Sequence, residues 1–376
     1  MRKMRPLRKF IKPTTVGIAA VGLLLTACGS TSSASTNSSS SSSGSSSSST
    51  PTGTALLTYS GSNATSVLEA AAKKEGKLNF MTSLAGPVVT QLVNAFEKQY
   101  PYIHVTVNRA DESTLIPQTI SEEQAGKPAA DVFEVTGPGA LELRAAGLLL
   151  PYADPTAKMP ANYVTKSGSN YLLVTDRISW LAFGYNTNKI PAADVPKTLS
   201  DLTNPALKGQ LVTEASSTGW DWIGSVLYAM GKTKGEAFLQ KLGQVNKPAI
   251  VSLSGAATAG LVASGQYGAS FSVFQDHFLE NAAKGSPVKW IPLEPVIANV
   301  GQVGVLKNVQ DPAAAALFVD FETGPAAQKL FQQLHYGSPN VSVPFKTWVP
   351  TQGATTAQQY SSELSSWHAL QTKDFG

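Results

Sequence analysis

From Leu56 onward, short strand-like and helix-like segments alternate along the chain. Strand patterns cover residues 77–81, 103–107 and 130–135, and helical stripes follow over residues 88–100 and 140–146. Loops rich in glycine and hydroxyl side chains follow the strands. Such alternation predicts an α/β fold, in which the loops after the strands gather at one sheet edge, the usual place for a ligand.

Two extended stretches divide this pattern. One covers residues 178–185, and the other runs from residues 289–293 to residues 300–305, with further helices near 220–230 and 233–244 between them. More helices are expected over residues 313–322 and from Gly324. The sequence therefore predicts two lobes joined by a hinge of two extended crossings, with a cleft between them. The expected division is lobe 1 over 56–178, lobe 2 over 179–293, a return to lobe 1 over 294–345, and a helical segment over 346–376 packed on lobe 2.

The first 27 residues form a signal pattern. Six basic residues precede position 13, and an apolar run over residues 16–25 ends in small residues before the only cysteine, Cys28. A charged start, a short apolar run and a small-residue end are typical of a secretory signal peptide. The run is too short to cross about 30 Å of hydrocarbon as a helix. The LTAC segment of residues 25–28 also resembles the bacterial lipobox, where cleavage leaves the cysteine as an acylated N-terminus.

Cys28 has no second cysteine to pair with, so lipidation is the preferred role and a free thiol is the alternative. Residues 30–53 contain fifteen serines. A segment with so little apolar surface cannot offset its ordering entropy, which predicts a disordered tether over residues 28–55. We expect an exported protein, lipid-anchored to the outer face of the cytoplasmic membrane or periplasmic.

The net charge of +4 belongs to the signal segment. Without its six basic residues the chain has 23 basic and 25 acidic groups. A nearly neutral chain without a basic stripe gives no electrostatic footprint for nucleic acid, which excludes that class of partner.

Three blocks of the folded part, taken in order, resemble the extracellular solute-binding proteins of ABC importers. The similarity is to the type II periplasmic-binding fold of the ferric-iron, thiamine and phosphonate binders, and it spans about residues 75–345. The blocks are ADVF to GLLLPY (residues 130–152), YNTN with PKTLSDLTNP (residues 185–209), and DPAAAALF with FETGPAAQ (residues 301–331).

The resemblance implies a monomeric receptor that closes two lobes on a small-molecule solute and delivers it to the transmembrane subunits of an ABC permease. It implies no cofactor and no catalysis. A sensor that presents the solute to a signalling receptor would use the same cleft. A secreted hydrolase on an α/β scaffold is the alternative from another class.

Iron-binding members of that family use a histidine, an acid and an adjacent tyrosine pair. Their positions fall near Leu84, near Thr136 and within residues 274–277 of this chain, where none of these residue types matches the pattern. Fe(III) prefers anionic oxygen ligands, so no metal site is expected, and a ferric receptor is kept as the alternative. Asp276 and His277 either contact the ligand or cap the following helix.

In place of metal ligands, the predicted cleft contains hydroxyl groups and backbone amides that could bind a solute. Helix N-termini present unpaired N–H groups and a positive dipole, which suits phosphate or carboxylate groups, although Ser and Thr there can also be ordinary N-caps. Trp180, Trp220 and Phe274 add faces on which an organic ligand could stack. The solute is therefore expected to be anionic or organic. The remaining candidate ligand-binding residues are Thr82, Ser83, Thr136, Gly137, Ser216, Ser217, Thr218, Gln275, Asp276 and His277.

Catalysis has little support. The folded part has no cysteine and no GxSxG motif, and the four histidines lack metal-ligand spacing. Glu122 and Glu123 are interpreted as a solvated helix face. Trp222 and Tyr228 are interpreted as core residues. We therefore predict that the chain is not an enzyme.

Overall fold

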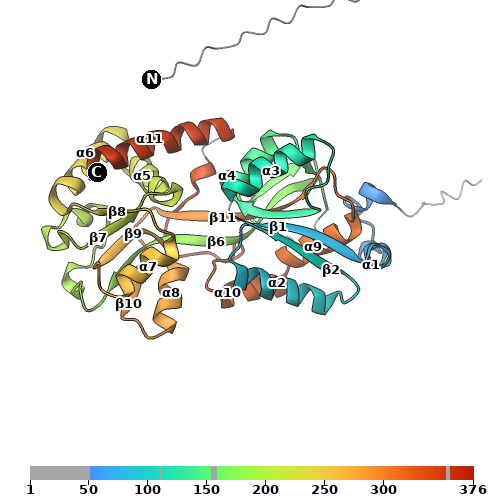
Figure 1. The fold of residues 1–376 in the computed structure, drawn as a ribbon, viewed down its shortest axis with the longest axis horizontal. Coiled ribbons are helices and arrows are strands. Elements are labelled where there is room, and N and C mark those ends of the chain that lie inside the picture. The colour runs from blue at the N-terminus through green and yellow to red at the C-terminus, as the bar shows by residue number, and fades with distance from the viewer. Residues whose placement is uncertain (1–50, 111, 154–158, 353–355) are drawn as a thin grey trace, which may run out of the picture. The chain divides into compact units, whose positions relative to one another are not determined.

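Two long antiparallel strands, β6 (Asn170–Asn186) and β11 (Val296–Leu306), lie at the centre of the sheet. The computed structural model describes residues 51–376 except 111, 154–158 and 353–355; Cys28, the signal segment and most of the serine-rich tether lie outside these residues. The strand order is β2-β1-β3-β11-β6-β9-β7-β8. Figure 1 shows β6 and β11 running from one half of the fold to the other. The predicted hinge of two extended crossings is confirmed.

Lobe 1 is built around the parallel strands β1, β2 and β3, with β11 antiparallel to β3. Helix α2 shows how local sequence sets the start, the buried face and the end of a helix in this lobe. Pro87 lies in the first turn, one face is buried through residues such as Val89 and Phe96, and the helix ends before Pro101. The elements of lobe 1 are α1 (Ala64–Glu75), β1 (Lys77–Thr82), α2 (Gly86–Gln99), β2 (His104–Arg109), α3 (Glu112–Gln124), β3 (Val132–Thr136), α4 (Gly137–Ala145), β4 (Leu149–Leu150), β5 (Val164–Ser167), α9 (Pro312–Thr323) and α10 (Pro325–Gln333).

Lobe 2 is built around the parallel strands β7, β8 and β9, and the C-terminal half of β6 pairs with β9 and β10. The C-terminal helix α11 (Ala357–Phe375) packs on α5 and α6 of this lobe. Its other elements are β7 (Leu211–Glu214), α5 (Ser217–Met230), α6 (Lys232–Asn246), β8 (Ala249–Val251), α7 (Gly255–Ala263), β9 (Ala269–Phe274), α8 (Gln275–Ala283) and β10 (Val288–Ile291), with β12 (Thr347–Trp348) pairing with β11.

Each face of the crossing strands packs into a different hydrophobic cluster. Ile178 and Trp180 of β6 pack with Val296 and Ala298 of β11 on one face. Leu181 of β6 and Ile297 of β11 belong to the core of lobe 2. The alternation follows from the two-residue period of a strand. Val174 of β6 and Val303 of β11 belong to the core of lobe 1, so both lobes share the same two strands.

A buried charge cluster lies where β3, β6 and α9 meet. Glu134, Asp176 and Glu322 are each 0% exposed, and the Arg177 guanidinium donates to Glu134 Oε1 at 2.8 Å. Asp176 occupies a bulge where the β6–β11 register shifts beside Gly301. A side chain at Gly301 would bring its Cβ to 2.5 Å from Asp176 Oδ1, which explains the glycine.

This cluster holds three carboxyl groups against one guanidinium. Burial raises the pKa of Glu134, raises the pKa of Asp176 to about 8, and raises the pKa of Glu322 well above its ordinary value. Desolvation penalises the charged form of a carboxyl group, and the neighbouring carboxyls add to that penalty. Protons held in the folded state therefore keep this cluster close to neutral.

We predict that stability falls as pH rises. The native state binds protons that the unfolded chain releases from about pH 4, so the free energy of unfolding decreases from there to about pH 8, the pKa of Asp176. Urea unfolding at about pH 5 and about pH 8 measures this, with an expected loss of more than about 1.4 kcal/mol, equivalent to one pKa unit.

The variant Glu322→Gln is expected to reduce this pH dependence, because an amide occupies the same site without a proton to lose. Glu280→Gln, at an exposed position on α8, serves as the control and keeps the wild-type slope. Stability that increases between these two pH values would contradict the assignment.

Candidate functional site

A cavity of about 230 Å³ lies between the lobes at the crossing strands. Lobe 1 contributes the first residue of α3 and the junction of β3 and α4. Lobe 2 contributes the first turns of α5, the end of β9 and one residue of α11. The lining residues are Glu112, Thr136, Pro138, Leu181, Ser217, Thr218, Asp221, Phe274, Ile297, Asn299 and Tyr360.

Glu112 organises the lobe 1 wall. Its carboxylate accepts hydrogen bonds from Ser83 Oγ at 2.8 Å, Thr136 N at 2.6 Å and Thr136 Oγ1 at 2.9 Å. These donors come from the ends of β1 and β3, two neighbouring parallel strands. The carboxylate is thus fixed at the sheet edge where ligands of open α/β folds bind.

The first turn of α5 forms the lobe 2 wall. Ser216 is the N-cap, and its Oγ accepts a hydrogen bond from Gly219 N at 3.4 Å. Ser217 and Thr218 follow it and line the cavity. Gly219 is required here because a Cβ at this position would lie 2.0 Å from the carbonyl oxygen of Glu214 in β7. This close approach places the start of the helix at the sheet edge.

Asp221 and Tyr360 complete the lobe 2 side. The Tyr360 hydroxyl donates to Asp221 Oδ1 at 3.0 Å. Burial raises the pKa of Asp221 to about 8, and burial and the neighbouring carboxyl raise the pKa of Tyr360. Sequence analysis did not single out Glu112, Asp221, Asn299 or Tyr360. Tyr360 lies 139 positions from its partner, and no local signal links the two.

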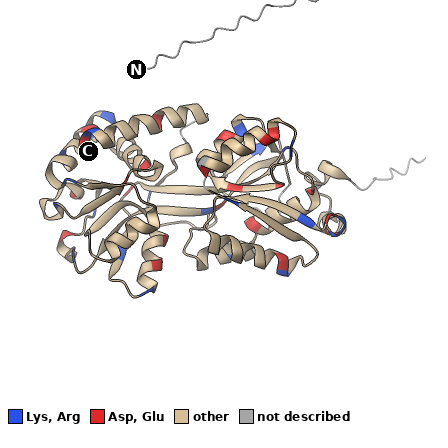
Figure 2. Ribbon diagram, viewed as in Figure 1, with Lys and Arg blue, Asp and Glu red and all other residues tan. Residues whose placement is uncertain are grey.

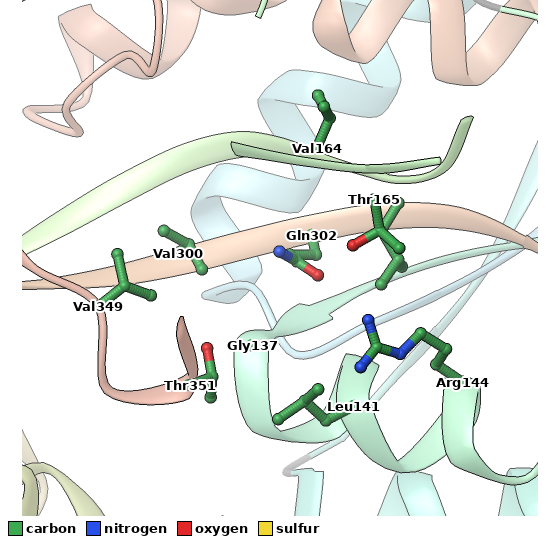
Figure 3. A pocket seen from close by; sticks show the side chains of 10 residues that line it. Gly137, Leu141, Arg144, Val164, Thr165, Val300, Gln302, Val349 and Thr351 are labelled. Carbon is green, nitrogen blue, oxygen red and sulfur yellow. The ribbon is translucent and has the colours of Figure 1, made fainter. Parts of the chain in front are cut away.

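A second cavity, of about 190 Å³, lies behind the start of α4. In Figure 3 the side chains of Arg144 and Gln302 point toward the same space, with Thr165 beside them. Gly137, a predicted ligand residue, lines this cavity, where its Cα faces Thr351. Gly137 therefore belongs to this second cavity and is absent from the lining of the first.

Thr136, Ser217, Thr218 and Phe274 are the predicted residues that the structure brings together around the inter-lobe cavity. Ser83 reaches it through Glu112. Ser216 turns away to its cap and to Glu214, whose Oε2 accepts from Ser216 Oγ at 3.0 Å. The assignment of these residues to ligand binding stays a prediction.

Other predicted residues serve the framework. Thr82 is 0% exposed and donates to Glu134 Oε2 at 2.7 Å, so its hydroxyl is used inside lobe 1. Gln275 is buried and joins two segments, since its Oε1 accepts from Trp180 N at 2.6 Å and its Nε2 donates to the His335 carbonyl at 2.9 Å. These contacts leave Thr82 and Gln275 outside the lining of the cavity.

The two candidate tryptophans are packed against protein. The Trp180 ring meets the Phe345 ring edge-on, with 5.3 Å between centroids. The Trp220 ring stacks on His368 of α11 at 4.3 Å, and its Nε1 donates to Gln371 Oε1 at 3.1 Å. Neither indole lines the inter-lobe cavity, because later segments of the chain cover both of them.

Asp276 and His277 lie in the first turn of α8. Asp276 is buried, its Oδ2 is 3.5 Å from His277 Nδ1, and desolvation raises its pKa. Neither side chain caps α8, whose N-cap residue Phe274 offers no side-chain hydrogen bond. Within residues 51–376, as far as the structure describes them, no three His, Cys, Asp or Glu side chains form a group able to hold a metal ion.

Two interpretations of single residues were wrong. Glu123 is not solvated: it is buried, and its carboxylate accepts from Ala129 N and Asn308 N, each at 3.0 Å. Tyr228 is not core: it is 63% exposed and stacks on Trp348. The exposure of Glu123 and Tyr228 was predicted from the pattern of their own helices alone. In the folded chain it depends on the segments that pack against those helices.

The charged groups of the described residues are distributed without a single-sign stripe. In Figure 2 basic and acidic positions are interspersed along the helices, and most of the ribbon carries neither. No helix among the described residues is both long enough and apolar enough to cross a membrane.

The described residues form a two-lobed α/β fold with a cavity between the lobes. The chain matches the family of bacterial extracellular solute-binding proteins over residues 91–357, and it belongs to that family. The family consists of extracellular or periplasmic solute-binding proteins and not of enzymes. The chain is thus the substrate-binding protein of an ABC transporter, as the resemblance predicted.

Known proteins show the same fold. The structure of Trichodesmium FutA, in complex with iron and citrate, superposes with a TM-score of 0.62 at 20% identity and covers 79% of this chain and 99% of that one. Fructose-6-phosphate-bound AfuA from Actinobacillus pleuropneumoniae gives 0.63 at 20% identity, with 80% and 99% covered. An uncharacterised protein of Haemophilus influenzae is 26% identical over 304 residues, covering 74% of this chain and 80% of that protein.

We predict that Gly219→Ala destabilises the protein by about 1–3 kcal/mol, because the new methyl group meets the Glu214 carbonyl oxygen and pushes the start of α5 away from β7. Chemical denaturation measures the loss. The matched control is Gly260→Ala on α7, where no atom lies within 4 Å of the position that the new Cβ would occupy and helix propensity favours alanine. Equal stability of the two variants would contradict the close-approach argument.

Proposed function

We propose that the chain is a membrane-tethered receptor that captures a small organic solute in the inter-lobe cavity and passes it to an ABC permease. The observation that carries the proposal is the cavity itself, whose walls come from both lobes. Lipidation of Cys28 and the serine-rich tether would keep the receptor near the permease. A flexible tether of about two dozen residues has a root-mean-square length of roughly 25–30 Å.

Closure follows from the placement of the contacts. Glu112 and Thr136 are attached to lobe 1, whereas Thr218 and Asp221 are attached to lobe 2. A solute that touches both sets binds the closed arrangement more tightly than the open one and shifts the population toward it. Among the described strands, β6 pairs with strands of both lobes, and β11 joins β6 to β3 of lobe 1. These two crossing strands therefore form the hinge.

A ferric receptor is less well supported. The similar structures include receptors whose ligands are iron with citrate and fructose-6-phosphate, so the fold does not select between them. In this cavity, Tyr360 is hydrogen-bonded to Asp221 and its pKa is raised, which disfavours the tyrosinate that Fe(III) would require. Ferric binding would produce a visible absorbance band from tyrosinate, and its appearance would favour iron.

We predict that filling the cavity abolishes solute capture. In the wild-type full chain, the dialysable small molecules of spent growth medium should raise the melting temperature, because a ligand at 100 times its Kd stabilises by about 2.7 kcal/mol. Thr218→Trp should remove this shift, since the indole occupies the space between the lobes. Thr90→Val, on the outer face of α2, is the control; an unchanged shift in Thr218→Trp would contradict the site.

We also predict that Cys28→Ala releases the protein from membranes. The wild-type chain should incorporate a labelled fatty acid and sediment with the membrane fraction, whereas the variant should do neither and should keep the melting temperature of the wild type. Incorporation of label into Cys28→Ala would contradict the anchor.

A further inference from the structure

The inter-lobe cavity carries acidic groups on opposite walls. Glu112 lines it from lobe 1 and Asp221 lines it from lobe 2. None of the described lining residues is Lys, Arg or His. Of the expected anionic or organic solutes, an anion would therefore meet two carboxyl groups and no cationic side chain in this cavity.

The hydrogen-bond partners of the two carboxyl groups are uncharged, and the buried Arg177 guanidinium, which is paired with Glu134, interacts with Glu112 only through space. The three donors to Glu112 are two hydroxyl groups and one backbone amide, and the donor to Asp221 is the Tyr360 phenol. Within the described residues, neither carboxyl group forms an ion pair. Glu112 accepts all three of its hydrogen bonds, and a carboxylate removed from water is costly unless it is paired, so a closed cavity favours a ligand that supplies positive charge beside Glu112. Asp221, whose pKa is raised, can lose its proton when such a charge arrives.

We propose that the solute is an organic cation, an ammonium compound whose charge lies between Glu112 and Asp221 when the lobes close. The inference rests on the proposed function and names the solute class of the same cavity. Phe274 and Tyr360 supply aromatic groups for the cation or for the carbons beside it. Leu181 and Ile297 supply an apolar floor from the crossing strands.

A bare metal ion fits this lining less well than an organic cation. Two carboxyl groups give a divalent or trivalent ion few anionic ligands, and the described residues contain no group of three acidic, His or Cys side chains around it. An apolar floor and a phenyl ring have no role in holding a hydrated ion. They match the carbon skeleton of an organic ammonium compound.

Binding of a cation has a further consequence for Asp221. Burial raises its pKa to about 8, so the group carries a proton at neutral pH unless a positive charge lies beside it. A positive charge brought beside it favours the ionised form and lowers this pKa. Cation binding at about pH 7 should therefore release up to about one proton, whereas binding of a neutral solute should release none.

The test uses the full chain and three classes of probe in thermal-shift and calorimetric titrations. The cations are putrescine, spermidine, choline and thiamine; the anions are inorganic phosphate, glucose 6-phosphate and methylphosphonate; the neutral compound is glucose; and ferric citrate is added as a metal probe. Calorimetry in two buffers of different ionisation enthalpy counts released protons. We expect at least one cation to bind with proton release, and the anions and glucose to give no shift.

Variants assign the effect to the two carboxyl groups. Glu112→Gln and Asp221→Asn should each weaken cation binding at least about tenfold, equivalent to about 1.4 kcal/mol, and Asp221→Asn should also remove the proton release. Glu122→Gln is the matched control, because it lies on the same helix α3 and outside the cavity. Unchanged cation affinity in both site variants would overturn the inference.

The outcomes separate this inference from the proposed function. Binding of an anion, glucose or ferric ion, lost in Thr218→Trp, would overturn the organic cation and keep solute capture in the cavity. Absence of binding by every probe class and by the growth-medium fraction would count against both.

Discussion

The antiparallel pairing of β6 with β11 is the constraint on which the rest of the structure depends. These strands pair with β3 and β5 toward lobe 1 and with β9 and β10 toward lobe 2, so a single hydrogen-bonded ladder connects both lobes. The β6–β11 pairing itself shifts register once, at the bulge of Asp176, and the buried Arg177–Glu134 pair lies beside it. The β5–β6 and β6–β9 pairings each contain a further register shift. A bulge bends and twists its strand. The hinge thus combines two continuous strands, which connect the lobes, with local irregularities in their pairing.

The site depends on this frame because its two walls come from different lobes. β1 and β3 end side by side, and the residues at their ends donate to Glu112. Beyond the crossing strands, α5 begins next to β7, and Gly219 permits the contact. In the proposed closure, a motion about the hinge would change the distance between these walls without breaking the hydrogen bonds within either wall.

Much of the fold could be predicted from the sequence. Helix α2 was recognisable from its apolar stripe and the following Pro101, and α9 from Asp311-Pro312. The crossing strands were recognisable as long apolar runs, since their residues are buried on both faces. Helix α3 was harder, because Pro117 lies inside it and its apolar residues form a weak stripe. Among the site residues, Thr136, Ser217, Thr218 and Phe274 were predictable because each ends a strand or begins a helix.

The sequence by itself determined the alternation of strands and helices, the hinge segments and the family resemblance, because these depend on short-range patterns and on their order. Only the tertiary structure decided which polar groups line the cavity between the lobes. In the folded chain, Thr82 and Gln275 bond to partners elsewhere in the chain. Helix α11 covers Trp220, and Tyr360 of the same helix bonds to Asp221. The tertiary structure also placed Glu112 and Asp221 on opposite walls of one cavity. The charge of a site is a sum over residues far apart in sequence, and only the folded chain brings those residues together.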